Sequence, residues 1–140
     1  LPERDGIARV GLLDFQLAQM GQPGYDLVSL LQDARRDVSR ETISAMIRRF
    51  QEATGAGPEL EASYAVLGAQ RALRILGVFV RLAKVSGKPG YLQLLPRVWK
   101  QLQENLAHPV NAPLERLCAR LLPRPTPETL ALIGSRCPSP

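Results

Sequence analysis

Asp14 is the side chain of this chain best placed to do chemistry. It ends the apolar segment Val10-Gly-Leu-Leu-Asp14-Phe15, which has the composition of a buried strand. A strand fixes the backbone of a carboxylate at its end, so the side chain can point into a cleft beyond it. Mg²⁺ binds one or two such carboxylates together with nucleotide phosphates. Asp14 is therefore a candidate magnesium ligand, although on these residues alone an Asp that begins a turn is the simpler explanation.

Two elements must position this carboxylate. Ile7 to Phe15 is predicted to be a short strand, alone or in a hairpin, because its apolar residues are continuous. Its partner strand is expected before Leu1. The spacing of Leu27, Leu30, Leu31 and Ala34 predicts a helix next, with Asp26 as its N-cap.

The rest of the chain is predicted to be helical, which makes the fold mainly α. The same spacing of apolar residues predicts helices at Ile43 to Phe50, Leu60 to Val85, Leu95 to Leu106 and Leu114 to Leu121. Gly55 and Gly87 are expected to end the first and second of these. After residue 122 a Pro-rich tail, 123–140, is expected to hold one short helix capped by Thr126.

The predicted helix from Leu60 to Val85 is apolar around most of its circumference, so it is expected to be the central helix of the domain. One narrow face carries polar and basic side chains: Gln70, Arg74, Arg81 and Lys84. This basic stripe could bind a partner or face solvent, and solvent is the ordinary arrangement for a single polar face.

Composition restricts the classes of function. At 140 residues, 45% of them hydrophobic, the chain is long enough for one domain. The net charge of +5 allows an anionic partner, but only 5% of residues are aromatic and the basic residues are scattered, so no nucleic acid is expected. Two cysteines without metal-ligand spacing favour the reducing cytoplasm. Arg74 and Arg81 interrupt the longest apolar stretch, so no membrane span is expected.

A longer pattern around Asp14 resembles a known family. The segment Asp14-Phe15-Gln16-x-Ala18-x-x-Gly21-x-x-x-Tyr25-Asp26-Leu27 is similar to the one that follows the catalytic loop in the aminoglycoside phosphotransferase superfamily. Within it, the sequence most resembles bacterial sugar kinases that phosphorylate N-acetylmuramate and N-acetylglucosamine at the anomeric position during cell-wall recycling. Further similar segments extend the resemblance over nearly the whole chain: Tyr64 to Arg71, Leu73 to Phe79 and Tyr91 to Trp99.

The resemblance implies a fold and a site. Residues 1–122 would be the helical C-terminal lobe of a protein-kinase-like phosphotransferase that uses ATP and Mg²⁺ to phosphorylate a sugar acceptor. Asp14 would bind the metal, Asp14 and Gln16 would contact the nucleotide, and Asp26 would support the site from behind. Leu17 departs from the pattern, because related sugar kinases often carry another Asp there.

Parts that such an enzyme needs are missing from the sequence. No His-x-Asp-x-x-x-x-Asn catalytic loop precedes Asp14, and a Gly-rich nucleotide loop is also absent. The single histidine, His108, is expected in a loop or helix cap. The chain is therefore expected to be part of a longer protein with an N-terminal lobe, and to be inactive alone. The alternative is a non-catalytic helical module that binds a partner through Arg74, Arg81 and Lys84.

Overall fold

The structure is a computed structural model that describes residues 3–11 and 20–135. These residues form six α-helices and three short 3-10 helices, with no strand within the described ranges, which confirms the mainly helical class. The α-helices are α1 (Gly24–Leu31), α2 (Arg40–Thr54), α3 (Glu59–Ser86), α4 (Leu95–Leu106), α5 (Ala112–Leu121) and α6 (Pro127–Gly134). The 3-10 helices are η1 (Gly6–Arg9), η2 (Pro89–Leu94) and η3 (Pro109–Asn111).

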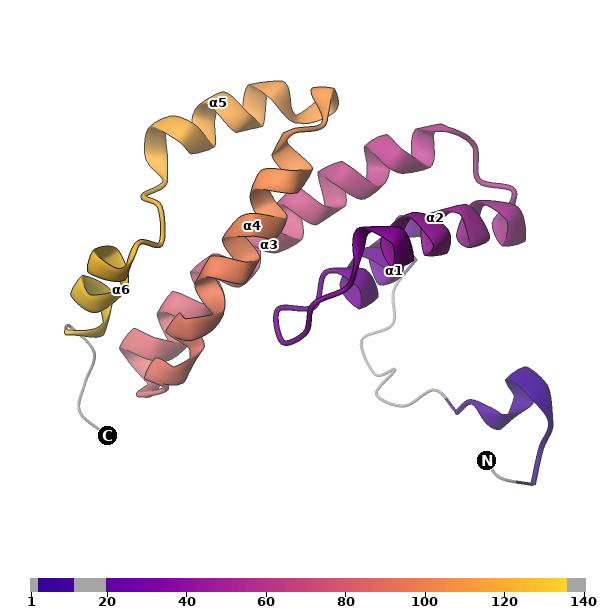
Figure 1. The fold of residues 1–140 in the computed structure, drawn as a ribbon, viewed down its shortest axis with the longest axis horizontal. Helices are drawn as coiled ribbons and strands as arrows, with labels where there is room; N and C mark the ends of the chain where they lie inside the picture. Colours follow the sequence, from indigo (N-terminus) through magenta and orange to yellow (C-terminus); the bar gives the residue numbers. More distant parts are fainter. Residues whose placement is uncertain (1–2, 12–19, 136–140) are drawn as a thin grey trace.

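Helix α3 is the central element, as predicted. It runs the length of the helical body, α4 returns antiparallel beside it, and α1 lies against its first half (Figure 1). Gly55 ends α2 and Gly87 ends α3, each in the left-handed conformation with φ of 70° and 62°. Glycine adopts this conformation without a Cβ clash, so both predicted helix ends are confirmed.

The main core lies between α3 and α4. Ala69 and Ala72 of α3 face Val98, Leu102 and Leu106 of α4, and all five side chains are buried. Small alanines let the α4 backbone come close to α3, so the larger side chains of α4 fill the interface at high density. This packing fixes α4 on the central helix.

A second cluster joins α1 and α2 to the start of α3. Val28, Leu31 and Tyr64 are buried at its centre. Helix α2 adds the partly buried Ile43 and Ile47 but contributes no fully buried residue. Helix α2 is therefore held by less apolar burial than α4.

The predicted strand at Ile7 to Phe15 is wrong over its described part. Residues Gly6–Arg9 form η1, and Ile7 and Val10 are 92% and 67% exposed. The described ranges contain no second strand to pair with, so a local turn satisfies the main chain instead, with the Val10 N–H donating to the Ile7 carbonyl at 3.1 Å. Leu12 to Phe15 lie outside the described residues.

The predicted short helix near the C-terminus forms as α6. The Thr126 side chain accepts a hydrogen bond from the Thr129 N–H at 3.3 Å, which is the predicted cap. Leu130 and Ile133 pack beside the buried Ala83, Leu92 and Leu95, so α6 lies against the body of the domain.

The basic stripe of α3 faces solvent. The side chains of Gln70, Arg74, Arg81 and Lys84 are all exposed. Within the described ranges, no helix combines the length and the apolar character that crossing a lipid bilayer requires.

Candidate functional site

Asp14 and Gln16, the predicted metal and nucleotide residues, lie outside the described residues. Their roles remain predictions. Across residues 3–11 and 20–135, no three His, Cys, Asp or Glu side chains lie together in a way that could hold a metal ion.

Asp26 is described, and it does not cap α1. The helix begins at Gly24 with Pro23 in the cap position, which places Asp26 in the first helical turn. A carboxylate there stabilises the helix through its dipole and the unpaired N–H groups, which explains why the sequence pattern resembles a cap. Its side chain is exposed and makes no hydrogen bond within the described part of the chain. It is therefore accessible to other groups.

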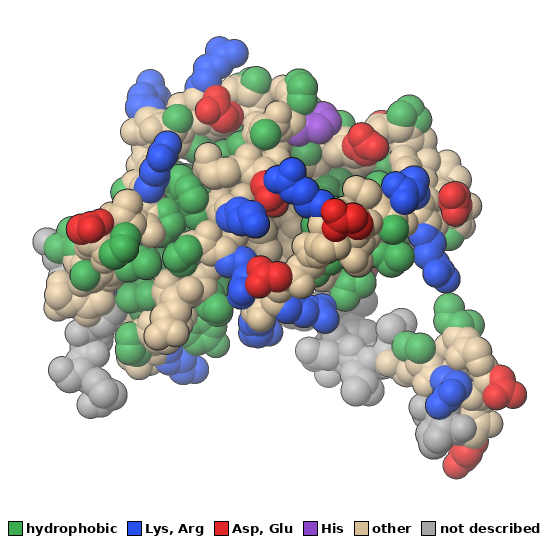
Figure 2. Space-filling model, viewed as in Figure 1, with side chains coloured by type: hydrophobic (Ala, Val, Ile, Leu, Met, Phe, Trp, Pro, Cys, Tyr) green, Lys and Arg blue, Asp and Glu red, His purple; other side chains and the backbone are tan. Residues whose placement is uncertain are grey.

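The described residues form a groove of about 1000 Å³ that is lined by α2, α3, α4 and the connection from α1 to α2. Its size is at the upper end of the range for small-molecule sites. Figure 2 shows basic and acidic side chains mixed on the face of the molecule that spans α4 and α2. The groove is therefore polar at its rim, and its residues are the candidates for ligand binding.

Tyr64 of α3 lies at the apolar base of this groove. It is 8% exposed, and its buried hydroxyl has no hydrogen-bond partner within the described structure. Burial raises the pKa of the Tyr64 hydroxyl, and the neighbouring Gln32 carboxamide lowers it by a smaller amount. Gln32 does not meet the geometry of a hydrogen bond to this hydroxyl. The hydroxyl therefore stays protonated, and its O–H is an unused donor that neighbouring side chains cover in the described structure.

Two carboxamides close the groove beside Tyr64. Gln32 donates to the Asn105 side-chain oxygen at 3.1 Å, and Asn105 donates back to the Gln32 oxygen at 2.8 Å. The Asn105 amide also donates to the Gln101 carbonyl at 2.7 Å. Asn105 is buried against Gly68 of α3, where a Cβ atom would collide with the Asn105 side chain. Glycine at 68 is therefore required for this carboxamide pair.

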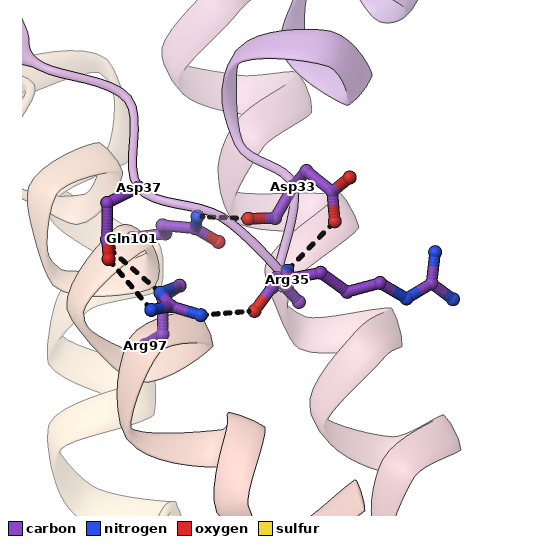
Figure 3. A network of polar contacts seen from close by, with 6 residues as sticks. Asp33, Arg35, Asp37, Arg97 and Gln101 are labelled. Atoms are coloured by element: carbon purple, nitrogen blue, oxygen red, sulfur yellow. Dashed lines mark hydrogen bonds and ion pairs between the residues drawn. The ribbon is translucent and has the colours of Figure 1, made fainter.

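An ion pair fixes the connection between α1 and α2 onto α4 (Figure 3). The Arg97 guanidinium donates two hydrogen bonds to the Asp37 carboxylate, at 2.9 and 2.8 Å, and a third to the Ala34 carbonyl at 2.9 Å. Arg97 thereby lowers the pKa of the exposed Asp37 carboxyl. One turn further along α4, Gln101 donates to the Asp33 carbonyl at 3.4 Å. Arg97, Gln101 and Asn105 recur every four residues, so one face of α4 holds the connection.

Charges along the groove are partly neutralised. Five cations line it (Arg36, Arg40, Arg48, Arg97 and Lys100) together with three acids (Asp37, Glu61 and Glu104). Arg97 pairs with Asp37, Arg40 with Glu104 at 3.2 Å, and Arg36 with the nearby Asp33 at 3.5 Å. Arg48 and Lys100 make no ion pair within residues 3–11 and 20–135. Two of the five groove cations therefore lie outside these ion pairs, and one of them, Lys100, is near enough to Asp37 to help lower its pKa.

The local sequence patterns do not identify these groove residues as candidates for ligand binding. The available signal was the polar line Arg97, Gln101 and Asn105 on α4, which a search for catalytic motifs does not detect. His108 does lie in the predicted kind of position: its Nδ1 caps η3 by accepting from the Val110 N–H at 3.2 Å.

The described residues thus form a mainly helical unit with a polar groove. The chain is similar to the N-acetylmuramate/N-acetylglucosamine kinase of Caulobacter vibrioides, with 46% identity over 128 residues, 88% of this chain and 34% of the relative. Its similarity to kinases of the same name from Neisseria meningitidis and Pseudomonas aeruginosa is 37% over 123 residues and 35% over 120. These two alignments cover 81% and 79% of this chain, and 37% and 36% of the relatives. No family model matches the chain.

The chain thus spans about a third of the length of the curated relatives it matches. The similarity to these kinases extends over 79–88% of this chain.

Proposed function

We propose that the chain is the C-terminal part of an ATP-dependent phosphotransferase that phosphorylates N-acetylmuramate or N-acetylglucosamine in cytoplasmic cell-wall recycling. The observation that carries this proposal is the similarity of 79–88% of the chain to kinases of that name. In this proposal the enzyme belongs to the aminoglycoside phosphotransferase superfamily, because the sequence pattern that begins at Asp14 resembles that superfamily. The rest of the enzyme, with an N-terminal lobe that carries the nucleotide loop and with the catalytic loop that precedes Asp14, would come from the upstream part of a longer protein.

In this proposal Asp14 binds Mg²⁺ and Gln16 contacts the nucleotide. The Asp14 carboxylate provides oxygen donors, which are the ligands that Mg²⁺ prefers. When bound, the metal neutralises charge on the phosphates during transfer. The exposed Asp26 carboxylate is available to accept hydrogen bonds from the catalytic loop of the missing part.

The groove beside Tyr64 is the proposed acceptor site. Sugars bind through hydrogen bonds to their hydroxyl groups and through apolar contact with the ring, and the groove offers both. Tyr64 provides a buried donor with no partner in the described structure, and Ile43 and Ile47 provide apolar surface.

Substitution of Asp14 in the complete protein tests the function. With ATP, Mg²⁺ and either sugar, the parent protein should form sugar phosphate, and Asp14→Asn should lower turnover by about a hundredfold or more, because a catalytic metal contributes several kcal/mol. The 140-residue chain alone should show no turnover. Asp5→Asn, an exposed Asp before the motif, is the matched control and should keep full activity.

Two results would contradict the proposal in different ways. Full turnover by Asp14→Asn would remove the metal assignment and leave the kinase function. No phosphorylation of either sugar by the complete parent protein would remove the proposed function itself.

A further inference from the structure

We propose that Arg48 and Lys100 bind the carboxylate of an acidic acceptor sugar in the groove and thereby favour N-acetylmuramate over N-acetylglucosamine. This inference rests on the proposed function, and it adds the residues that distinguish the two sugars.

The two cations come from different walls of the groove. Arg48 lies on α2 one turn after Ser44, beside the face that carries Ile47, and Lys100 lies on α4 between Arg97 and Glu104. A carboxylate between the walls would therefore meet a guanidinium from one side and an ammonium from the other. Charge-assisted hydrogen bonds of this kind are stronger than those between neutral groups.

The other three cations of the groove are already engaged. Arg97 uses three N–H groups on Asp37 and Ala34, Arg40 pairs with Glu104, and Arg36 pairs with Asp33. Arg97 is held by three hydrogen bonds, and Arg40 and Arg36 lie 3.2 and 3.5 Å from carboxylates that would compete with an anionic ligand, so these three are poorer candidates for binding it. Arg48 and Lys100 make no ion pair within the described ranges. Lys100 does lie near Asp37 and helps to lower its pKa, but Arg97 holds both oxygens of that carboxylate.

The two sugars differ in one charged group, which Arg48 and Lys100 could recognise. N-acetylmuramate is N-acetylglucosamine with a lactyl ether, so it adds one carboxylate to an otherwise shared structure. The Tyr64 hydroxyl and the remaining N–H of the Gln32 carboxamide can bind groups that both sugars carry. Arg48 and Lys100 would bind only the group that differs, and specificity arises from such differences in interaction.

A charge-matched pair of double variants tests the inference in the complete protein. Arg48→Gln/Lys100→Gln removes both groove cations. Arg49→Gln/Arg116→Gln is the control: it removes the same charge from exposed residues of α2 and α5 that do not line the groove. Measured kcat/KM for N-acetylmuramate should fall about tenfold or more in the first variant, through KM, and stay within about twofold for N-acetylglucosamine. The control should change neither value beyond about twofold.

Three results would overturn the inference. Equal losses for both sugars would show a general role for the cations in binding or folding. Equal losses in the control variant would show an effect of net charge. Unchanged selectivity would show that the carboxylate binds elsewhere.

A binding measurement separates this inference from the proposed function. If the parent phosphorylates neither sugar, calorimetric titration with each sugar still decides the point. Tighter binding of N-acetylmuramate that the groove variant alone weakens would support the carboxylate site, and equal or absent binding of the two sugars would overturn it.

Discussion

The two walls of the groove differ in how firmly they are held. Helix α4 buries Val98 and Leu102 completely against α3, whereas α2 contributes no fully buried residue. The α4 wall also presents Arg97, Gln101 and Asn105 in fixed hydrogen bonds. The α2 wall is attached by half-buried apolar residues and by the exposed Arg40–Glu104 ion pair, which is worth little in water.

This difference assigns the walls different tasks. A helix held by dense packing keeps its side chains in one geometry, so α4 sets the positions of the polar groups. A helix with little burial opens locally at low free-energy cost, so α2 is expected to open more readily than α4. The two cations proposed to bind the carboxylate lie one on each wall.

The largest effect on stability is expected from removing a buried side chain of α4. Leu102→Ala removes a side chain that is 0% exposed and should lower the free energy of unfolding by about 2–5 kcal/mol. Ile47→Ala on α2, where the side chain is half-buried, should cost only about 1–2 kcal/mol. Urea unfolding followed by circular dichroism, in chains of the same length, measures both. Equal costs would mean that α2 is held as firmly as α4.

Substitutions at two glycines of α3 test how much the Gln32–Asn105 carboxamide pair contributes to stability. Gly68→Ala places a methyl group on Asn105, which must leave Gln32 and lose buried hydrogen bonds, so we expect a loss of about 1–3 kcal/mol. Gly77→Ala on the same helix has open space around the new methyl group and should gain roughly 0.5–1 kcal/mol. The same unfolding experiment compares them. A Gly68→Ala variant as stable as the parent would show that the carboxamide pair is not needed for stability.

Much of the helical framework follows from local sequence. Gly55, Gly87 and Thr126 are the residue types that end or begin helices, and each does so here. The local pattern gave a wrong prediction where the secondary structure depends on a distant partner. The apolar residues near Val10 have the composition of a strand, but a strand needs another strand beside it, and the described ranges contain none.

The groove could not be predicted from local sequence patterns. Gln32 and Asn105 are 73 residues apart, and Arg97 reaches Asp37 across 60. Their partnership depends on α4 returning along α3, which is a property of the tertiary fold and has no motif. Asp14 is the opposite case, because its candidate role comes from a local pattern and it lies outside the described residues.

A smaller effect is expected at the buried hydroxyl between the walls. Tyr64→Phe removes an oxygen that has no partner in the described structure, so the free energy of unfolding should stay the same or rise by up to about 1 kcal/mol. In the complete protein the same variant should raise KM for both sugars, because a donor to the acceptor is lost. A marked loss of stability would show that the hydroxyl is satisfied within the fold.

The smallest effect concerns the ion pair at the surface and depends on pH. Arg97 holds the pKa of Asp37 below its ordinary value of 3.8, so the folded state favours the charged carboxylate. The stabilisation is therefore complete above about pH 5 and is lost as the pH falls through the lowered folded pKa. Asp37→Asn should unfold at lower urea concentration than the parent at pH 6, and the difference should shrink toward pH 3.

A second pair of variants isolates the Arg97 contribution from other acid effects. Glu41 and Glu128 also have lowered pKa values, through hydrogen bonds at the helix starts, so every variant will lose some stability in acid. If Arg97 causes the Asp37 shift, then Asp37→Asn made in an Arg97→Gln background should give a difference that no longer varies with pH. A difference that still shrinks in acid would mean that another group, such as the nearby Lys100, controls the charge of Asp37.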